Sequence, residues 1–142
     1  MIKPERFHID DLSRFTQCDS DGNIWAEMAV CSMDPNKDII SLLDEEDRII
    51  AIVILQHFRK GVAELSLVRG IGINSNRIGF HKCCLKLVEF FFESMGLHRL
   101  EMSIDPDRED RKKWCESLGF SFDHSCSGYV EGKTYYIYSR LK

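Results

Sequence analysis

The alternation of apolar and polar positions along the chain predicts an α/β fold. The most apolar segment, I-I-A-I-V-I-L within Arg48 to Phe58, predicts a strand that is covered on both faces. Asp38 to Leu43 is a second apolar run, and the acidic stretch Asp44 to Asp47 between the two predicts the turn of an antiparallel hairpin. Polar and apolar positions then alternate from Val62 to Val68. Glu64 is therefore expected on a polar strand side that can line a cleft.

A helical period extends from about Arg77 to Met95, with one apolar face and one charged face. The apolar face consists of Cys84, Leu85, Val88, Phe91, Phe92 and Met95, and the charged face of Lys82, Lys86, Glu89 and Glu93. Gly96 supplies the left-handed residue that ends this helix, and Arg99 to Asp105 alternates as a further strand.

After that strand, a second helix is predicted to begin at Asp107 or Asp110 and to end at Gly119. Two strands, Ser121 to Val130 and Lys133 to Leu141, complete the chain around a Glu131-Gly132 turn.

The N-terminal region predicts a short strand followed by two helices. The strand is Ile2 to Ile9, the first helix runs from Asp10 or Asp11 through Cys18, and the second covers Asn23 to Cys31. The complete order predicts a mixed, mostly antiparallel central sheet flanked by helices, in a single domain of residues 1–142.

Composition argues against several classes of protein. With 44% hydrophobic and 30% charged residues, the chain is too apolar to be disordered, and its apolar runs are too short to span a membrane. A net charge of −4 without a basic block argues against nucleic acid as a partner. The start M-I-K-P-E-R-F-H-I-D lacks the features of a signal peptide, so the six cysteines are expected to stay reduced in the cytoplasm. No metal is expected, because the nearest candidates, His81, Cys83 and Cys84, point in different directions around a helix.

The segment from Gly96 to Phe120 resembles a known family. It contains G-L-H-R-L-E, then D-P-D-R, then W-C-E-S-L-G-F, at the spacing seen in the GCN5-related N-acetyltransferases, and the resemblance covers nearly the whole chain. G-V-A-E, F-H-K and the final Y-Y-I-Y-S-R strand resemble a subgroup of small phage-type acetyltransferases. The resemblance implies splayed central strands, acetyl-coenzyme A as co-substrate and an amine as acceptor.

The resemblance also implies that the pyrophosphate of acetyl-coenzyme A binds at the start of the long helix. Amides at a helix N-terminus and the helix dipole favour an anion there. The family pattern is Arg or Gln, two residues, Gly, one residue, then Gly or Ala, whereas N-R-I-G-F-H offers only Gly79. The alternative is that Gly79 merely tolerates the helix start and that Arg77 is a solvated charge. The cofactor candidates are Leu67, Val68 and Arg69, as main-chain partners of the pantetheine arm, with Asn76, Arg77, Ile78, Gly79, Phe80, His81, Lys82 and Arg108.

Two further positions depart from the family pattern. Arg108 stands where the family often has Asn, and Cys115 stands where it often has the Tyr that protonates the leaving thiolate. Arg108 cannot donate a proton at neutral pH but can pair with a phosphate. Cys115 shares a helix face with Leu118, which fits a core position.

Acetyl transfer to an amine needs a base for the ammonium proton and benefits from an acid for the thiolate. Glu64 is the predicted base, and an ordinary exposed strand glutamate is the alternative interpretation. Tyr129 is the predicted acid, and aromatic packing within Tyr135 to Tyr138 is the alternative. Trp25 and Met28, in the predicted helical overhang, offer either an apolar acceptor surface or ordinary helix core.

The sequence supports functions of different classes. The first is an acetyl-coenzyme A-dependent N-acetyltransferase that moves an acetyl group to an amine of a small molecule, peptide or protein by direct attack. The second is a catalytically weak or inactive module of the same fold that binds coenzyme A or a protein partner, and the third is a structural protein. The sequence names neither the acceptor nor the oligomeric state, and a homodimer stays open.

Overall fold

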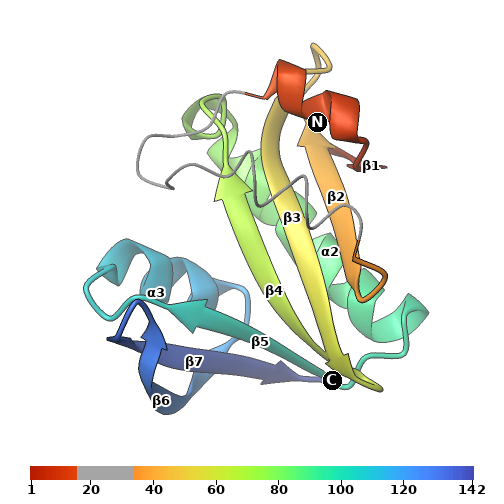
Figure 1. Cartoon of the computed structure of the whole chain (residues 1–142). Coiled ribbons are helices and arrows are strands. Elements are labelled where there is room, and N and C mark those ends of the chain that lie inside the picture. The colour runs from red at the N-terminus through yellow and green to blue at the C-terminus, as the bar shows by residue number, and fades with distance from the viewer. Residues whose placement is uncertain (16–33) are drawn as a thin grey trace. The chain divides into compact units, whose positions relative to one another are not determined.

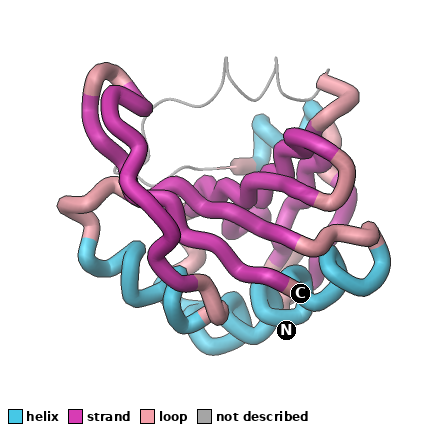
Figure 2. The backbone as a smooth tube through the Cα atoms, turned by 90° about the horizontal axis from the view of Figure 1, so that it is seen from below, coloured by secondary structure: helices cyan, strands magenta, loops and turns pink. Residues whose placement is uncertain are grey.

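The structure is a computed structural model that describes residues 1–15 and 34–142. Its strands form a seven-stranded sheet in the order β1-β2-β3-β4-β5-β7-β6 (Figure 1). Residues Met1–Gln56 with Ser66–Lys86 form one compact unit, and residues His57–Leu65 with Leu87–Lys142 form the other. Figure 2 distinguishes the strands, helices and loops of the same chain. The mixed, mostly antiparallel sheet with flanking helices that the sequence predicts is therefore confirmed.

The first unit contains the antiparallel strand pairs β1–β2 and β2–β3. Its elements are β1 (Lys3–Arg6), η1 (Ile9–Arg14), β2 (Lys37–Leu43), most of β3 (Ile49–Arg59), the end of β4 (Val62–Arg69), η3 (Asn74–Asn76) and the start of α2 (Arg77–Ser94). The acidic stretch Asp44 to Asp47 forms the predicted turn, in which Asp44 accepts a hydrogen bond from Arg48 Nε at 2.9 Å. Both faces of β3 are covered, as predicted, because Ile49 to Val53 are all buried.

The N-terminal strand is shorter than the sequence predicts, because β1 ends at Arg6 and a 3-10 helix begins at Ile9. The Asp11 carboxylate explains this change of direction. It accepts hydrogen bonds from the His8 backbone N–H at 3.0 Å and from the buried Ser41 hydroxyl at 3.1 Å. The predicted helix from Asp10 or Asp11 is thus a 3-10 helix to Arg14, and the rest of it, with the helix Asn23 to Cys31, lies outside the described residues.

Two glycines after β4 are required by close packing. A Cβ atom at Gly70 would lie 2.8 Å from the Ile50 carbonyl oxygen, and one at Gly72 would lie 2.8 Å from Ile50 Cγ2. The Gly70 N–H also donates to that carbonyl oxygen at 2.7 Å. These glycines therefore fix where the chain leaves β4 on its way to α2.

We expect Gly70→Ala to lower the free energy of unfolding by about 1 to 3 kcal/mol, because the added methyl group meets rigid backbone. Chemical denaturation of the purified protein measures this change. Gly79→Ala is the matched control, because its Cβ would meet only Ile2 Cγ1 at an ordinary 3.4 Å. Equal stability of the two variants would contradict the packing argument.

The long helix α2 begins at the predicted residue and ends one residue early, at Ser94, before Gly96 with φ 68°. The predicted charged face is exposed. The apolar face is rotated from the prediction, because Cys83 and Leu87 are buried whereas Leu85 is only partly buried. The helix thus buries an arc centred on Cys84, Val88 and Phe91.

The second unit contains the C-terminal strands and the helix α3. Its elements are the end of β3, the start of β4, the end of α2, β5 (Arg99–Ile104), α3 (Glu109–Ser117), β6 (Ser121–Val130) and β7 (Lys133–Leu141). Glu131 and Gly132 both have positive φ, 49° and 77°, as a tight hairpin turn requires. The two terminal strands therefore have the predicted bounds. Helix α3 begins at Glu109, between the two predicted starts.

Candidate active site

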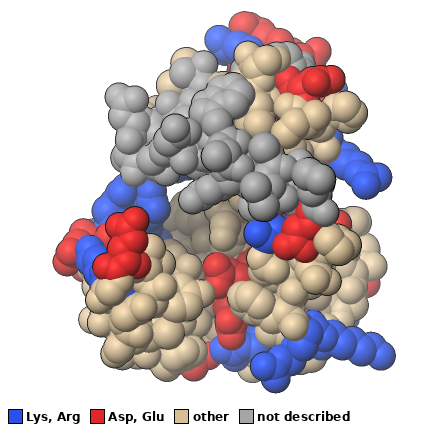
Figure 3. Space-filling view, in the orientation of Figure 1, with Lys and Arg blue, Asp and Glu red and all other residues tan. Residues whose placement is uncertain are grey.

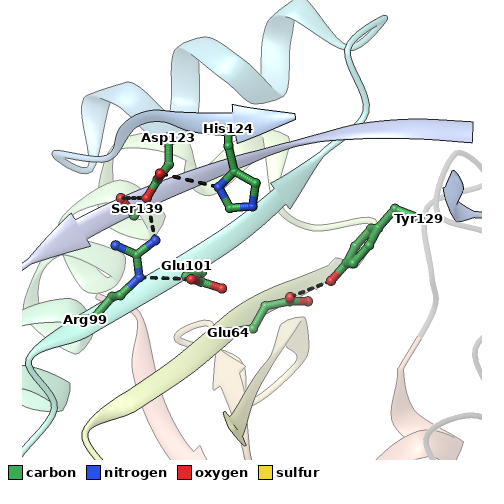
Figure 4. Close-up of polar contacts among 7 residues, drawn as sticks. All are labelled: Glu64, Arg99, Glu101, Asp123, His124, Tyr129 and Ser139. Atoms are coloured by element: carbon green, nitrogen blue, oxygen red, sulfur yellow. Dashed lines mark hydrogen bonds and ion pairs between the residues drawn. The ribbon is translucent and has the colours of Figure 1, made fainter. Parts of the chain in front are cut away.

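Glu64 lies where the parallel pairing of β4 and β5 ends. In the described residues this ladder consists of Val62–Arg99, Ala63–Leu100 and Glu64–Glu101, although both strands are longer. Register partners in a parallel ladder project from the same face of the sheet, so the side chains of Glu64 and Glu101 are neighbours (Figure 4). Glu64 is partly buried. Two carboxylates thus meet at the end of the short ladder.

An irregularity in β6 brings Tyr129 to Glu64. Cys126 pairs with Tyr135 and Val130 pairs with Lys133, so three residues of β6 lie opposite one residue of β7. Gly128, inside this bulge, has φ 63°, a conformation that glycine adopts without strain. The Tyr129 hydroxyl donates a hydrogen bond to Glu64 Oε2 at 3.1 Å (Figure 4). The structure therefore joins the two predicted catalytic residues directly.

Burial and neighbouring charge change the acidity of this pair. Burial raises the pKa of Glu64, and the charge of Glu101 raises it further, against the hydrogen bonds from Tyr129 and Ser103. Burial and the Glu64 charge raise the pKa of Tyr129 to about 12. At neutral pH Tyr129 is therefore a neutral hydrogen-bond donor, and Glu64 accepts a proton more readily than an exposed glutamate does.

A second polar group lies beside this pair on β5, β6 and β7. Arg99 Nε donates to Glu101 Oε1 at 2.9 Å, and the same guanidinium forms an ion pair with Asp123. Asp123 also accepts a hydrogen bond from the Ser139 hydroxyl at 3.0 Å, and His124 Nδ1 lies 3.4 Å from its other oxygen. These contacts hold the pKa of Asp123 at about 2, with Arg99 as the largest cause. The group is a network anchored on Arg99.

The predicted cofactor loop lies in the other unit, between β4 and α2. The Asn76 side-chain amide donates to the Gly72 carbonyl oxygen at 2.9 Å, and η3 leads into α2 at Arg77 without a break. Arg77, Ile78 and Lys82 are exposed, His81 is partly buried and Phe80 is buried. Leu67 and Arg69 are partly buried on β4, and Val68 belongs to the hydrophobic core.

Gly79 has no role in packing that would require glycine. Its φ is not positive, and a Cβ there would meet only Ile2 Cγ1 at 3.4 Å. Glycine in a helix is nevertheless about 0.5 to 1 kcal/mol less favourable than alanine. Folding alone therefore does not explain this glycine, in contrast to Gly70 and Gly72.

No family model matches the sequence, and no curated protein matches it. Solved structures match it over nearly its full length. A Vibrio cholerae protein provisionally described as a ribosomal-protein-serine acetyltransferase is 15% identical, with a TM-score of 0.80 over 99% of this chain and 94% of that one. A mutant of the spermidine N-acetyltransferase SpeG from Vibrio cholerae is 11% identical, with a TM-score of 0.78 over 99% and 93%. The fold is that of the GCN5-related N-acetyltransferases.

Two positions where the sequence departs from the family pattern described above, Arg108 and Cys115, have other partners here. Cys115 is fully buried, with its sulfur 3.5 Å from that of Met102, and burial raises its pKa to about 12. This agrees with the core interpretation of Cys115. Arg108 makes two hydrogen bonds to the Asp110 carboxylate, at 3.2 and 3.1 Å.

Three polar residues beside Glu64 were not predicted as site residues from the sequence of this N-acetyltransferase fold. They are Arg99, Glu101 and Asp123. The alternation of β5 places Arg99 and Glu101 on one side, which was a readable signal. Asp123 had no such signal, because it projects from a second bulge in β6, between the pairs Phe122–Tyr138 and His124–Ile137.

Other predictions concern metal and membrane. Within residues 1–15 and 34–142, no three His, Cys, Asp or Glu side chains are grouped to hold a metal ion. No helix in those ranges is both long and apolar enough to cross a membrane. The face in Figure 3 carries interspersed basic and acidic side chains. Trp25 and Met28 lie outside the described residues.

Proposed function

We propose that this chain, residues 1–142 as one domain, is an acetyl-coenzyme A-dependent N-acetyltransferase. The observation that carries the proposal is the hydrogen-bonded pair Glu64–Tyr129, at the end of the short β4–β5 ladder in an N-acetyltransferase fold. A carboxylate with a raised pKa next to a neutral phenol provides one proton acceptor and one proton donor.

Glu64 takes a proton from the ammonium group of the acceptor, directly or through one water. The amine lone pair then attacks the thioester carbonyl carbon, the carbon–nitrogen bond forms and the carbon–sulfur bond breaks. The ammonium group loses two protons in total. One of them neutralises the leaving thiolate and the other goes to solvent. Burial of Glu64 supports this role, because it brings the carboxylate closer in basicity to the group it deprotonates.

Tyr129 donates a proton to the leaving thiolate after Glu64 has been protonated. While Glu64 is ionised, its charge holds the hydroxyl proton and keeps the Tyr129 pKa high. Protonation of Glu64 removes that charge, so the phenol becomes a stronger acid when the thiolate needs a proton. Transfer of the Glu64 proton to the Tyr129 oxygen restores the pair.

We expect Tyr129→Phe to lower kcat by roughly 10-fold to 100-fold, because it removes the proton donor. It also removes a hydrogen bond that lowers the Glu64 pKa, so the acidic limb of the pH–rate profile should move to higher pH. The control is Tyr135→Phe, since the Tyr135 ring packs 6.1 Å from that of Tyr129. If Tyr129 serves only aromatic packing, kcat and the limb will both stay unchanged.

The start of α2 is the proposed site for the phosphates of acetyl-coenzyme A. Gly79 supports this location, because packing does not require a glycine there, whereas a residue without a side chain lets phosphate approach the backbone. Arg77 and Lys82 are the proposed charged contacts and His81 is a proposed polar contact, with Asn76, Ile78 and Phe80 as the adjoining backbone. Leu67, Val68 and Arg69 stay the proposed main-chain partners of the pantetheine arm.

The direct test mixes purified protein with acetyl-coenzyme A and a panel of amines. The panel should contain spermidine and a peptide with a free N-terminus, because the matched structures include a spermidine N-acetyltransferase and a ribosomal-protein acetyltransferase. Release of coenzyme A thiol together with acetylated amine, seen by mass spectrometry, supports the proposal.

The second candidate function is a coenzyme A-binding module without turnover. The burial of Cys115 and the contact of Arg108 with Asp110 favour it, because neither residue presents the acid or the amide common in the family. Tight binding of coenzyme A without acetylation of any amine would favour this candidate. No binding would contradict both.

A further inference from the structure

The two carboxylates at the end of the β4–β5 ladder have different partners. Glu64 contacts the neutral hydroxyl of Tyr129, whereas Glu101 contacts the guanidinium of Arg99 (Figure 4). Arg99 is itself fixed from the far side, because Asp123 binds the same guanidinium and Ser139 holds Asp123. Glu101 is therefore a carboxylate held by a cation, and Glu64 is a carboxylate held by a neutral donor.

We infer that Arg99 and Glu101 are positioning residues for Glu64: Arg99 fixes Glu101, and the fixed negative charge of Glu101 makes Glu64 the carboxylate of the two that takes up a proton. The inference rests on the proposed function for its catalytic meaning, although the charge relation exists without turnover. Its physical basis is that two neighbouring carboxylates resist simultaneous ionisation, so the one without a cation is protonated first.

Besides Arg99 and Glu101 on β5, the titratable groups on the described strands of this unit include Asp123, His124, Cys126 and Tyr129 on β6, Tyr135 on β7, and His57 and Arg59 at the end of β3. Among them, Tyr129 donates a hydrogen bond to Glu64 and Asp123 pairs with Arg99. Arg59, Arg99 and Glu101 line a pocket of about 300 Å³ together with Phe58 and Val62. Arg99 and Glu101 are only partly buried, so both can be substituted without removing a core side chain.

The test is a titration of Glu64 in the free protein, which needs no substrate. The carboxyl carbons of ¹³C-labelled glutamate are followed by NMR from acid to neutral pH, and the Glu64 signal is the one that Glu64→Gln removes. In Glu101→Gln, whose amide oxygen can still accept from Arg99 Nε, we expect the Glu64 midpoint to fall by about 0.5 to 1 unit. Glu89→Gln, which removes an exposed glutamate paired with Arg140, is the matched control and should leave the midpoint unchanged.

The role of Arg99 is tested by repeating the substitution in an Arg99→Met background. If Arg99 fixes Glu101, the fall caused by Glu101→Gln should be smaller there than in the original protein, because Glu101 is no longer held beside Glu64. An unchanged midpoint in Glu101→Gln overturns the inference, and an equal fall in both backgrounds overturns the role of Arg99. The protein could show the expected changes in the Glu64 midpoint and still acetylate no amine. That result would uphold this inference and contradict the proposed function, so the experiment distinguishes failure of one from failure of the other.

Discussion

Glu64→Gln is expected to lower kcat/KM for the amine by roughly 100-fold or more at neutral pH, because general base catalysis contributes about that much. In the original protein, activity should fall as pH falls through the Glu64 pKa, since the base works only when ionised. Burial raises that pKa, so the fall should begin above the range of an exposed glutamate. The variant should lack this limb. Steady-state rates from about pH 5 to pH 9 measure both effects.

The same variant should keep its fold and its affinity for acetyl-coenzyme A. Glutamine carries no charge that burial would penalise, so the free energy of unfolding should be unchanged or higher. Glu89→Gln serves again as the control, because it removes an equal charge from an exposed ion pair. A pH–rate profile of Glu64→Gln that overlays that of the original protein would contradict the assignment of the base.

Enlarging Gly79 is expected to separate cofactor binding from stability. Gly79→Ala and then Gly79→Val should weaken binding of acetyl-coenzyme A by about 10-fold to 100-fold, which corresponds to the loss of one or two charge-assisted hydrogen bonds to phosphate. The stability of Gly79→Ala should not fall, because alanine is the better helix former and its Cβ has room beside Ile2. Isothermal titration calorimetry and chemical denaturation measure the two quantities.

The control for this series is a substitution outside the proposed phosphate contacts. Ser75→Ala removes a hydroxyl that donates to the Gly72 carbonyl oxygen at 3.1 Å, one turn before Gly79, and should leave the affinity within about twofold. Should Gly79→Val bind acetyl-coenzyme A as tightly as the original protein does, the helix start would not be the phosphate site.

The bounds of helices and strands were predicted most accurately where a regular hydrophobic period ends at a turn or helix-ending residue. Helix α2 and strands β6 and β7 have nearly the predicted bounds, because Gly96 and Glu131-Gly132 end long regular patterns. The buried arc of α2 was placed less well. A period of 3.6 residues predicts that the helix has an apolar stripe of a given width. The elements that pack against the helix determine the centre of the buried face, and here they bury Leu87 more than Leu85.

The candidate site was also predictable in part from a local period. Strand alternation gives the side of the strand on which Glu64 lies, and it needs no knowledge of distant residues. The contact with Tyr129, 65 residues away, depends on a bulge whose sequence signal is only the small residues before Tyr129. Asp123 was missed on similar grounds, because an added residue in β6 changes which side of the strand a side chain occupies.

Both bulges lie in β6, which is the last strand in the sheet order and, within residues 1–15 and 34–142, pairs with β7 alone. An added residue in an inner strand disturbs two ladders, whereas one in β6 disturbs a single ladder and leaves the buried strands as they are. Relatives with the same core could therefore gain or lose the groups at positions 123 and 129 by a change in length of one or two residues. The proposed proton transfer through Tyr129 is thus open to change by insertion and deletion at the border of the sheet, at little cost to folding.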